Sequence, residues 1–212
     1  MSDVTKRLYS AVLEGDLDAA QTAVREAIGE GIPVDEILSK GLVAAMGEVG
    51  CLFENGEYYV PEMLISARTM QACLVLLKPY LSNAMVKSPG KVVVGTVHGD
   101  LHDIGKNLVC MMLEGAGFEV KDLGIDVDAE KFITQIQAEK AQIVAFSAML
   151  TTTMPYMKTI IQALDESGLR QTVKVMVGGA PLTQTFADAI GADGYAPDAS
   201  QAVALARQLV AA

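Results

Sequence analysis

The sequence is short of cysteine and of positive charge. Its three cysteines, Cys51, Cys73 and Cys110, lie far apart without a Cys-x-x-Cys pair. This spacing excludes a cysteine-based zinc site and a disulfide framework, and it suits a reducing cytosol. Lysine and arginine number 16 against 26 aspartates and glutamates, for a formal net charge of -10. Such a chain lacks the basic surface that binds phosphate backbones, so we expect no nucleic-acid partner.

Long apolar runs are also missing. No uninterrupted apolar stretch approaches the roughly 20 residues that span a bilayer, and the N-terminus turns acidic before any run typical of a signal peptide. The sequence therefore predicts a cytoplasmic protein without a membrane partner. Intrinsic disorder is excluded because 51% of the 212 residues are hydrophobic and 20% are charged, which is enough to build one large domain or two small ones.

The N-terminal part has the pattern of helices. Between Thr5 and Leu81 apolar residues recur at helical spacing, with breaks at Gly15-Asp16, around Gly29 to Pro33, and at Asn55-Gly56. Four helices with short connections are predicted, forming a small antiparallel bundle over residues 1–82. Residues 83–90 lose the apolar stripe and contain Ser-Pro-Gly, so we interpret them as an interdomain linker.

Residues 91–212 alternate β-branched runs with helical stretches, which predicts an α/β domain. Buried strands are expected at 92–97, 118–123, 143–146, 173–177 and 194–196. The predicted fold is a doubly wound parallel five-stranded sheet of the flavodoxin or Rossmann-like kind, with helices on both faces. Ligands bind at the carboxyl ends of such strands, so the segments 98–105, 147–154 and 178–182 are candidate site loops.

The usual phosphate-binding loops are missing. The sequence has no GxxxxGK[ST] motif, and Gly115-Ala116-Gly117 lies at the end of a predicted helix, where it is interpreted as a C-cap.

The loop after the first strand carries the most specific chemistry. His102 lies between Asp100 and Asp103, and Gly105 follows three residues later. His102 can offer one ring nitrogen to a metal while Asp100 accepts the other N–H, which fixes the tautomer. A site built from protein ligands would need more of them, from His98, Asp103 or distant residues. A metal held by its own macrocycle needs only one, and a hydrogen-bonded loop histidine without a metal remains the alternative.

Several segments resemble one family. GTVHGDLHDIGKNLV is similar to the cobalamin-binding motif Asp-x-His-x-x-Gly of methionine synthase and of the corrinoid methyl-carrier proteins of three-component methyltransferase systems. The segment from Ser147 to Thr153 resembles the family's Ser-x-Leu segment, and Gly178-Gly179 resembles its Gly-Gly pair. The N-terminal half resembles the family's helical cap, so the resemblance covers essentially the whole chain in the family's order.

The resemblance implies a cobalamin cofactor, bound base-off and His-on, that alternates between methylcob(III)alamin and cob(I)alamin. His102 would be the lower axial ligand of cobalt, Asp100 its hydrogen-bond partner, and Thr153, where Ser is commoner, the next member of the relay. The other residues implied to contact the corrin or its nucleotide tail are Asp103, Gly105, Ser147, Met149, Thr151, Gly178, Gly179 and Ala199. Met149 replaces the usual Leu, a change that conserves volume.

In the cap, Phe53, Val60 and Met63 match residues that cover the upper face of cobalt, with Val60 in place of the commoner Leu. From the residues alone, membership of the bundle core is as good an interpretation. His98 stands where relatives often have Lys or Glu, and we expect no role for it.

The resemblance implies a methyl carrier rather than a complete enzyme. A substrate-specific methyltransferase would load it, a second methyltransferase with tetrahydrofolate or a thiol as acceptor would unload it, and a reductive activator would restore oxidised cobalt. The methyl donor (methanol, a methylamine or a methoxyaromatic, for example) is not given by the sequence. Two alternatives are a cobalamin-dependent sensor, which would need an output domain, and the small subunit of an adenosylcobalamin mutase, which the methyl-transfer cap disfavours.

Overall fold

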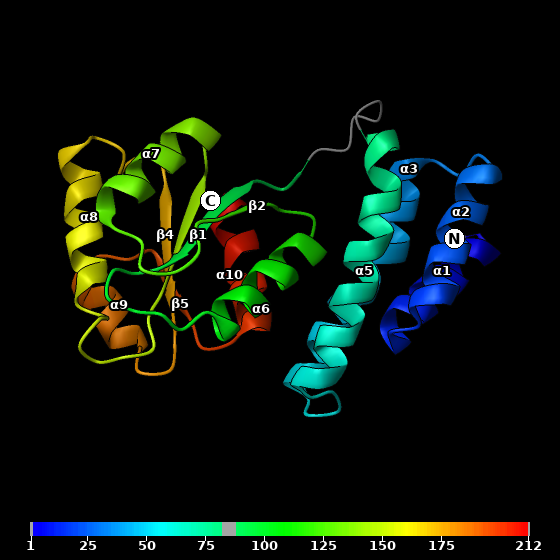
Figure 1. The fold of residues 1–212 in the computed structure, drawn as a ribbon, viewed down its shortest axis with the longest axis horizontal. Coiled ribbons are helices and arrows are strands. Elements are labelled where there is room, and N and C mark those ends of the chain that lie inside the picture. Colours follow the sequence, from blue (N-terminus) through cyan, green and yellow to red (C-terminus); the bar gives the residue numbers. More distant parts are fainter. Residues whose placement is uncertain (1, 82–87, 212) are drawn as a thin grey trace. The chain divides into compact units, whose positions relative to one another are not determined.

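The computed structural model describes residues 2–81 and 88–211 (Figure 1). The chain divides into two compact units, a helical unit and an α/β unit that begins at Ser88. Residue 82 and residues 83–87 of the predicted linker lie outside the described residues.

The helical unit consists of four helical segments, as the apolar spacing predicts. Its elements are α1 (Asp3–Glu14), α2 (Leu17–Gly29), the continuous run of α3 (Val34–Glu36), η1 (Ile37–Val43) and α4 (Ala44–Glu54), and α5 (Val60–Leu81). Asp16 caps α2 by accepting a hydrogen bond from the main-chain N–H of Ala19 at 3.0 Å. The π-helical turn η1 was not predicted. It holds Gly41 so close to α1 that a Cβ there would lie 2.7 Å from Leu8.

Helix α5 is apolar over most of its length. Its stretch Val60–Leu77 has a mean hydropathy of 1.3 and could cross a membrane by length and composition alone. Core helices of soluble proteins pass the same test, and α5 packs against α1, α2 and α4. The stretch is also interrupted by two charges, Glu62 and Arg68. The buried residues Met63, Met70 and Leu77 give α5 the inward face of a bundle helix.

The α/β unit has the predicted sheet. Its strands are β1 (Lys91–Thr96), β2 (Glu119–Asp122), β3 (Ile143–Ser147), β4 (Lys174–Gly178) and β5 (Gly194–Ala196). All neighbouring pairs are parallel and the order is β2-β1-β3-β4-β5. This is the flavodoxin-like order, in which the chain moves outward in opposite directions from β1 and β3 and creates a switch point between them.

Helices cover both faces of this sheet. They are α6 (Ile104–Gly115), α7 (Ala129–Glu139), α8 (Tyr156–Glu166), α9 (Gln184–Ile190) and α10 (Ala199–Ala211). Figure 1 shows α7, α8 and α9 on one face and α6 and α10 on the other. The doubly wound prediction is thereby confirmed, and the strand ends differ from their expected positions by at most one residue.

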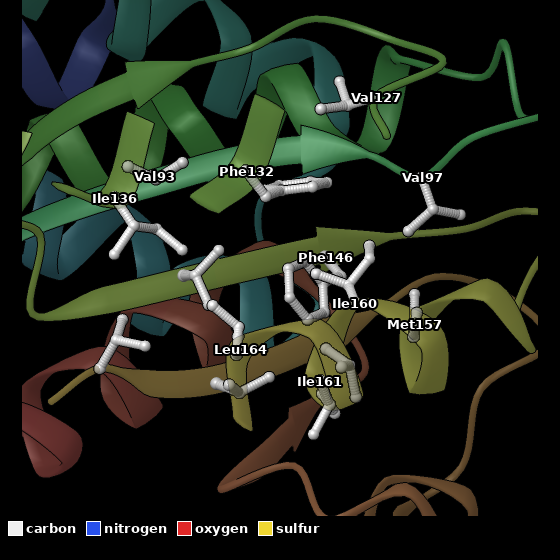
Figure 2. Packing of buried hydrophobic residues seen from close by; sticks show 14 of the residues in the cluster. Val93, Val97, Val127, Phe132, Ile136, Phe146, Met157, Ile160, Ile161 and Leu164 are labelled. Atoms are coloured by element: carbon white, nitrogen blue, oxygen red, sulfur yellow. The ribbon is translucent and has the colours of Figure 1, made fainter. Parts of the chain in front are cut away.

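The core of the α/β unit lies between the sheet and helices α7 and α8 (Figure 2). Phe132 of α7 and Phe146 of β3 meet edge to face, with ring centroids 4.9 Å apart. Gly95 makes room for this pair, because a Cβ there would lie 2.7 Å from the Phe132 ring. Close packing beneath β1 and β3 gives their C-terminal loops a rigid base.

Candidate functional site

The candidate site lies where β1 and β3 end side by side. Thr96, the last residue of β1, pairs with Ser147, the last residue of β3. The fully buried hydroxyl of Thr96 donates a hydrogen bond to the carbonyl of His102 at 2.9 Å. The loop after β1 is therefore folded back over the end of its own strand, at the switch point where such sheets bind ligands.

The carboxylate of Asp100 connects the loops after β1 and β3. Its Oδ1 accepts hydrogen bonds from the main-chain N–H and from Nδ1 of His102, at 3.1 and 2.8 Å. Its Oδ2 accepts them from Thr153 Oγ1 at 2.6 Å and from the main-chain N–H groups of Met149 and Leu150 at 2.8 and 3.3 Å. One oxygen thus serves each loop, which fixes the two loops against each other.

Asp100 is ionised in this environment. Burial of the side chain would by itself raise its pKa, but the hydrogen bonds from Thr153, from the N–H of Met149 and from His102 hold the pKa well below its usual range. A carboxylate can only accept hydrogen bonds, so Nδ1 of His102 carries the proton. The lone pair of His102 then lies on Nε2, the nitrogen that a metal would bind.

The imidazole of His102 is open to the outside, with 55% of its side chain exposed although Asp100 beneath it is fully buried. Large apolar side chains around it are exposed as well: Leu101 (68%), Ile104 (81%), Met149 (49%) and Leu150 (41%). Exposed apolar residues gathered around one polar group mark a binding surface. This surface suits a ligand that is broad and largely apolar.

The start of α6 leaves space beside His102. A Cβ at Gly105 would meet no protein atom within 4 Å, so the space next to this glycine is open. Asp103 is exposed and accepts a hydrogen bond from the Asn107 side chain at 3.2 Å, within its own helical turn. Lys106, which the sequence did not single out, is buried and forms hydrogen bonds with Asp122 at 2.5 Å and Asn107 at 2.6 Å.

Small residues continue from the site across the ends of β3, β4 and β5. Ser147 pairs with Gly178, and Gly178 with Ala196, while Thr151 is exposed and Ala199 is buried. Gly179 has φ 132°, and a Cβ there would lie 1.9 Å from the carbonyl oxygen of Ala148. Contact with the chain's own backbone is therefore enough to require glycine at position 179, whether or not a nucleotide tail passes over it.

The predicted cap residues lie in the helical unit and differ in exposure. Phe53 near the end of α4 is partly exposed, Val60 at the start of α5 is 41% exposed, and Met63 is fully buried. Phe53 and Val60 are thus available to a ligand, whereas the surroundings of Met63 are those of a core residue.

A second histidine–carboxylate pair lies on the same loop and was missed from the sequence. Nδ1 of His98 is 2.7 Å from Oδ1 of Asp126, and the main-chain N–H of Gly99 donates to the same oxygen at 2.8 Å. The hydrogen bond from Gly99, together with the bond and charge of His98, lowers the pKa of Asp126. Asp126 lies 28 residues after His98, so no local spacing could have connected them.

The donor set fits a metal that brings its own equatorial ligands. Among residues 2–81 and 88–211, no group of three or more His, Cys, Asp or Glu side chains stands close enough to hold an ion. His102 offers one nitrogen, its orientation is fixed by Asp100, and apolar surface and open space surround it. A corrinoid meets these conditions, so fold and site define a cobalamin-binding protein.

Comparison with known proteins identifies the family of the chain. Two families described as B12 binding domains match residues 90–204 and residues 4–78. Dimethylamine corrinoid protein 1 of Methanosarcina acetivorans is 46% identical over 210 residues, covering 99% of this chain and 98% of the relative. Trimethylamine corrinoid protein 1 of the same organism is 40% identical over 210 residues, covering 98% and 97%.

Solved structures agree. A chain of the methanol:cobalamin methyltransferase complex MtaBC from Methanosarcina barkeri matches with a TM-score of 0.89 and 31% identity, over 99% of this chain and 80% of that chain. A cobalamin-binding protein from Desulfitobacterium hafniense matches with a TM-score of 0.82 and 30% identity, over 99% of both chains. The chain belongs to the B12-binding corrinoid proteins, and cobalamin is its cofactor.

Proposed function

We propose that this protein carries a methyl group between two methyltransferases on a cobalamin that is bound base-off, with His102 as its lower axial ligand. The observation that supports this most directly is the orientation of His102, whose Nδ1 is bonded to the ionised Asp100 at 2.8 Å. Nε2 is left as a ligand on an exposed apolar surface. When bound, cobalamin supplies a cobalt centre that accepts a methyl group from one partner and yields it to another.

Asp100 controls where the proton of His102 stays. Because its pKa is well below the usual range, Asp100 does not take the Nδ1 proton and remains its acceptor. The hydrogen bond to the carboxylate fixes the tautomer and the ring orientation of His102, which leaves Nε2 free to act as a ligand.

Thr153 orients Asp100 in turn. Its hydroxyl is 2.6 Å from Oδ2 of Asp100 and 3.0 Å from the carbonyl of Leu150. Threonine is branched at Cβ, so its hydroxyl has fewer rotamers available than that of serine. Thr153 therefore acts as a donor to Asp100, as the relay requires.

The remaining contacts are assigned by position. Ser147, Gly178, Gly179 and Ala199 border the row of small residues at the ends of β3 to β5, and this supports a path for the nucleotide tail there. Asp103, Gly105, Met149 and Thr151 stand at the loops beside His102 and would meet the corrin.

In our proposal residues 1–82 form a cap and residues 91–212 the cobalamin-binding domain, joined by the linker 83–90. We assign Phe53, Val60 and Met63 to the cover over the upper face of cobalt, Phe53 and Val60 from positions with exposed surface and Met63 from the interior of the bundle. Phe53→Ala should then speed photolysis of the methylated cofactor. If Phe53 is instead only a bundle residue, the variant should lose up to roughly 3–5 kcal/mol of stability with an unaltered photolysis rate.

We place the protein in the cytoplasm, as a soluble partner of a methylamine-specific methyltransferase. Dimethylamine corrinoid proteins at 42–46% identity support dimethylamine as the methyl source. A second methyltransferase that uses tetrahydrofolate or a thiol would remove the methyl group, and a reductive activator would rescue oxidised cobalt.

Two experiments test the proposal. In the cobalt(II) form, protein labelled with ¹⁵N-histidine should show one histidine nitrogen coupled to cobalt by electron paramagnetic resonance, and His102→Ala should lose that coupling. A coupling that persists in the variant excludes His102 as the ligand. Separately, the reduced protein should accept a methyl group only when a methyltransferase is added, and fastest with a dimethylamine-specific one. Rapid methylation of the protein by methanol, a methylamine or a methoxyaromatic without an added enzyme would contradict the carrier assignment.

A further inference from the structure

The pair formed by His98 and Asp126 binds the same loop that carries Asp100 and His102. Oδ1 of Asp126 accepts hydrogen bonds from His98 Nδ1 at 2.7 Å and from the main-chain N–H of Gly99 at 2.8 Å. The main-chain N–H of Asp126 donates to the carbonyl of Asp100 at 3.1 Å. One aspartate therefore contacts three consecutive residues that end at the buried carboxylate.

The same pair also reaches the segment after β3. The ring of His98 packs against Tyr156 with centroids 5.4 Å apart. Tyr156 begins α8 three residues after Thr153, which donates to Asp100. Asp100 connects the loop after β1 to the loop after β3, and the pair of His98 and Asp126 connects the same loop after β1 to the segment after β2 and to the start of α8.

The backbone at Asp126 indicates that this arrangement is imposed rather than incidental. Asp126 has φ 52°, one of two described residues other than glycine with a positive φ. Such a conformation is strained for a residue with a Cβ and persists where the surroundings hold it. Here it is held by the parallel bridge between Val97 and Val127, two residues that Figure 2 shows at this end of the sheet, and by the contacts to His98 and Gly99.

We propose that His98 and Asp126 are positioning residues that hold the loop of residues 98–102 in the geometry in which Asp100 presents Nε2 of His102 to cobalt. The inference rests on the proposed role of His102 as axial ligand. Neither residue needs to touch the cofactor. Their effect passes through the main chain of Gly99 and Asp100.

The chain offers well-matched variants. His98→Asn keeps a donor, because Asn Nδ2 occupies nearly the same place as His Nδ1, whereas His98→Phe keeps the aromatic contact with Tyr156 and loses the donor. Asp126→Gly removes the carboxylate and accepts a positive φ without strain. Asp128→Asn is the control, because it removes an equal charge two residues away and Asn can still cap α7 as Asp128 does.

The first measurement uses the full chain without cofactor. The protein has only two histidines, so in either His98 variant both ¹⁵N-imidazole signals belong to His102. We expect His98→Asn and Asp128→Asn to keep the Nδ1–H tautomer of His102. His98→Phe and Asp126→Gly should raise the other tautomer about threefold to tenfold, less than the roughly 10–100-fold effect of disturbing a direct partner of a metal-bound histidine.

The second measurement uses the cobalamin-loaded chain. The fraction of cobalt(II) coupled to a histidine nitrogen should fall in His98→Phe and Asp126→Gly and stay at the wild-type level in His98→Asn and Asp128→Asn. If all four variants match the wild type in both measurements, the positioning role is wrong. If the wild type itself shows no histidine coupling, the axial role of His102 is wrong, and the tautomer measured without cofactor still decides whether His98 and Asp126 position the loop.

Discussion

Replacing Asp100 by asparagine should change which nitrogen of His102 carries the proton. An asparagine side chain has one oxygen and one NH2 group, whereas both oxygens of Asp100 accept hydrogen bonds. On the Oδ2 side, two of the donors are the fixed main-chain N–H groups of Met149 and Leu150, so the amide oxygen should turn to that side. The NH2 group then faces Nδ1 of His102, 2.8 Å away in the wild type.

The NH2 group of the asparagine and the Nδ1–H group of His102 are both donors, so they cannot form a hydrogen bond with each other. His102 must give up the Nδ1 proton to accept from the NH2 group, and the proton moves to Nε2, where it blocks ligation. We expect cobalamin affinity or methyl transfer to fall by about 10–100-fold, as for other losses of a metal-bound histidine's partner. The variant also loses charge-assisted hydrogen bonds and sets the main-chain N–H of His102 against a donor, so the free energy of unfolding should fall by about 2–4 kcal/mol.

The assay is a ¹⁵N-histidine spectrum of the cofactor-free variant, which should show the Nε2–H tautomer, followed by the cobalt(II) spectrum of the loaded protein and urea unfolding. Asp165→Asn is the control, because Asp165 is an exposed carboxylate on α8. The reasoning is refuted if Asp100→Asn keeps the Nδ1–H tautomer and normal ligation. Loss of ligation without a change of tautomer would refute it equally, because the effect would then come from a displaced loop.

Three further predictions concern single groups. Thr153→Val should lower the free energy of unfolding by about 1.5–3 kcal/mol through loss of one hydrogen bond to a carboxylate. Thr153→Ser should keep that hydrogen bond and most of the stability. Equal urea midpoints for the two variants would contradict this prediction. Gly179→Ala should largely abolish folding, because its Cβ would lie 1.9 Å from Ala148 O. Gly168→Ala, with φ 73° and no neighbour within 4 Å, should lower the free energy of unfolding by only about 1 kcal/mol. Similar melting temperatures for the two variants would show that the predicted clash at position 179 is wrong. Burial raises the pKa of the Cys73 thiol to about 11, so the stability that the protonated thiol contributes is complete below pH 9 and is lost as the pH rises toward 11. In Cys73→Ala, the free energy of unfolding measured in urea should therefore depend less on pH between 9 and 11.

Much of the fold could be predicted because single features decide it. The run from Val92 to Val94 is β-branched and buried on both sides, so only a central parallel strand suits it. The alternation of strands with helices then predicts a sheet covered by helices on both faces, and the switch point of such a sheet predicts where a ligand binds. The π-helical turn from Ile37 to Val43 was missed because it goes with a tertiary contact. Helix α1 packs against Gly41, and the local sequence does not predict that contact.

The site divides in the same way. The hydrogen bond between Asp100 and His102 could be predicted because the two residues are close in the sequence and their chemistry is specific. His98, Asp126 and Lys106 could not, because each acquires its role from a partner on another loop or strand. Lys106 in particular has the composition of a surface residue, and its burial becomes possible only through Asp122 at the end of β2.

The way in which Asp100 is held restricts how the loop after β3 can vary. Positions 149 and 150 donate their main-chain N–H groups to the carboxylate. Every residue type except proline has such an N–H group. Side chains there are free to change with the ligand surface they border, and methionine in place of leucine disturbs nothing beneath. Proline is the residue these positions cannot accept, because it has no N–H to donate. Related sequences should therefore show wide apolar variety at both positions and no proline at either.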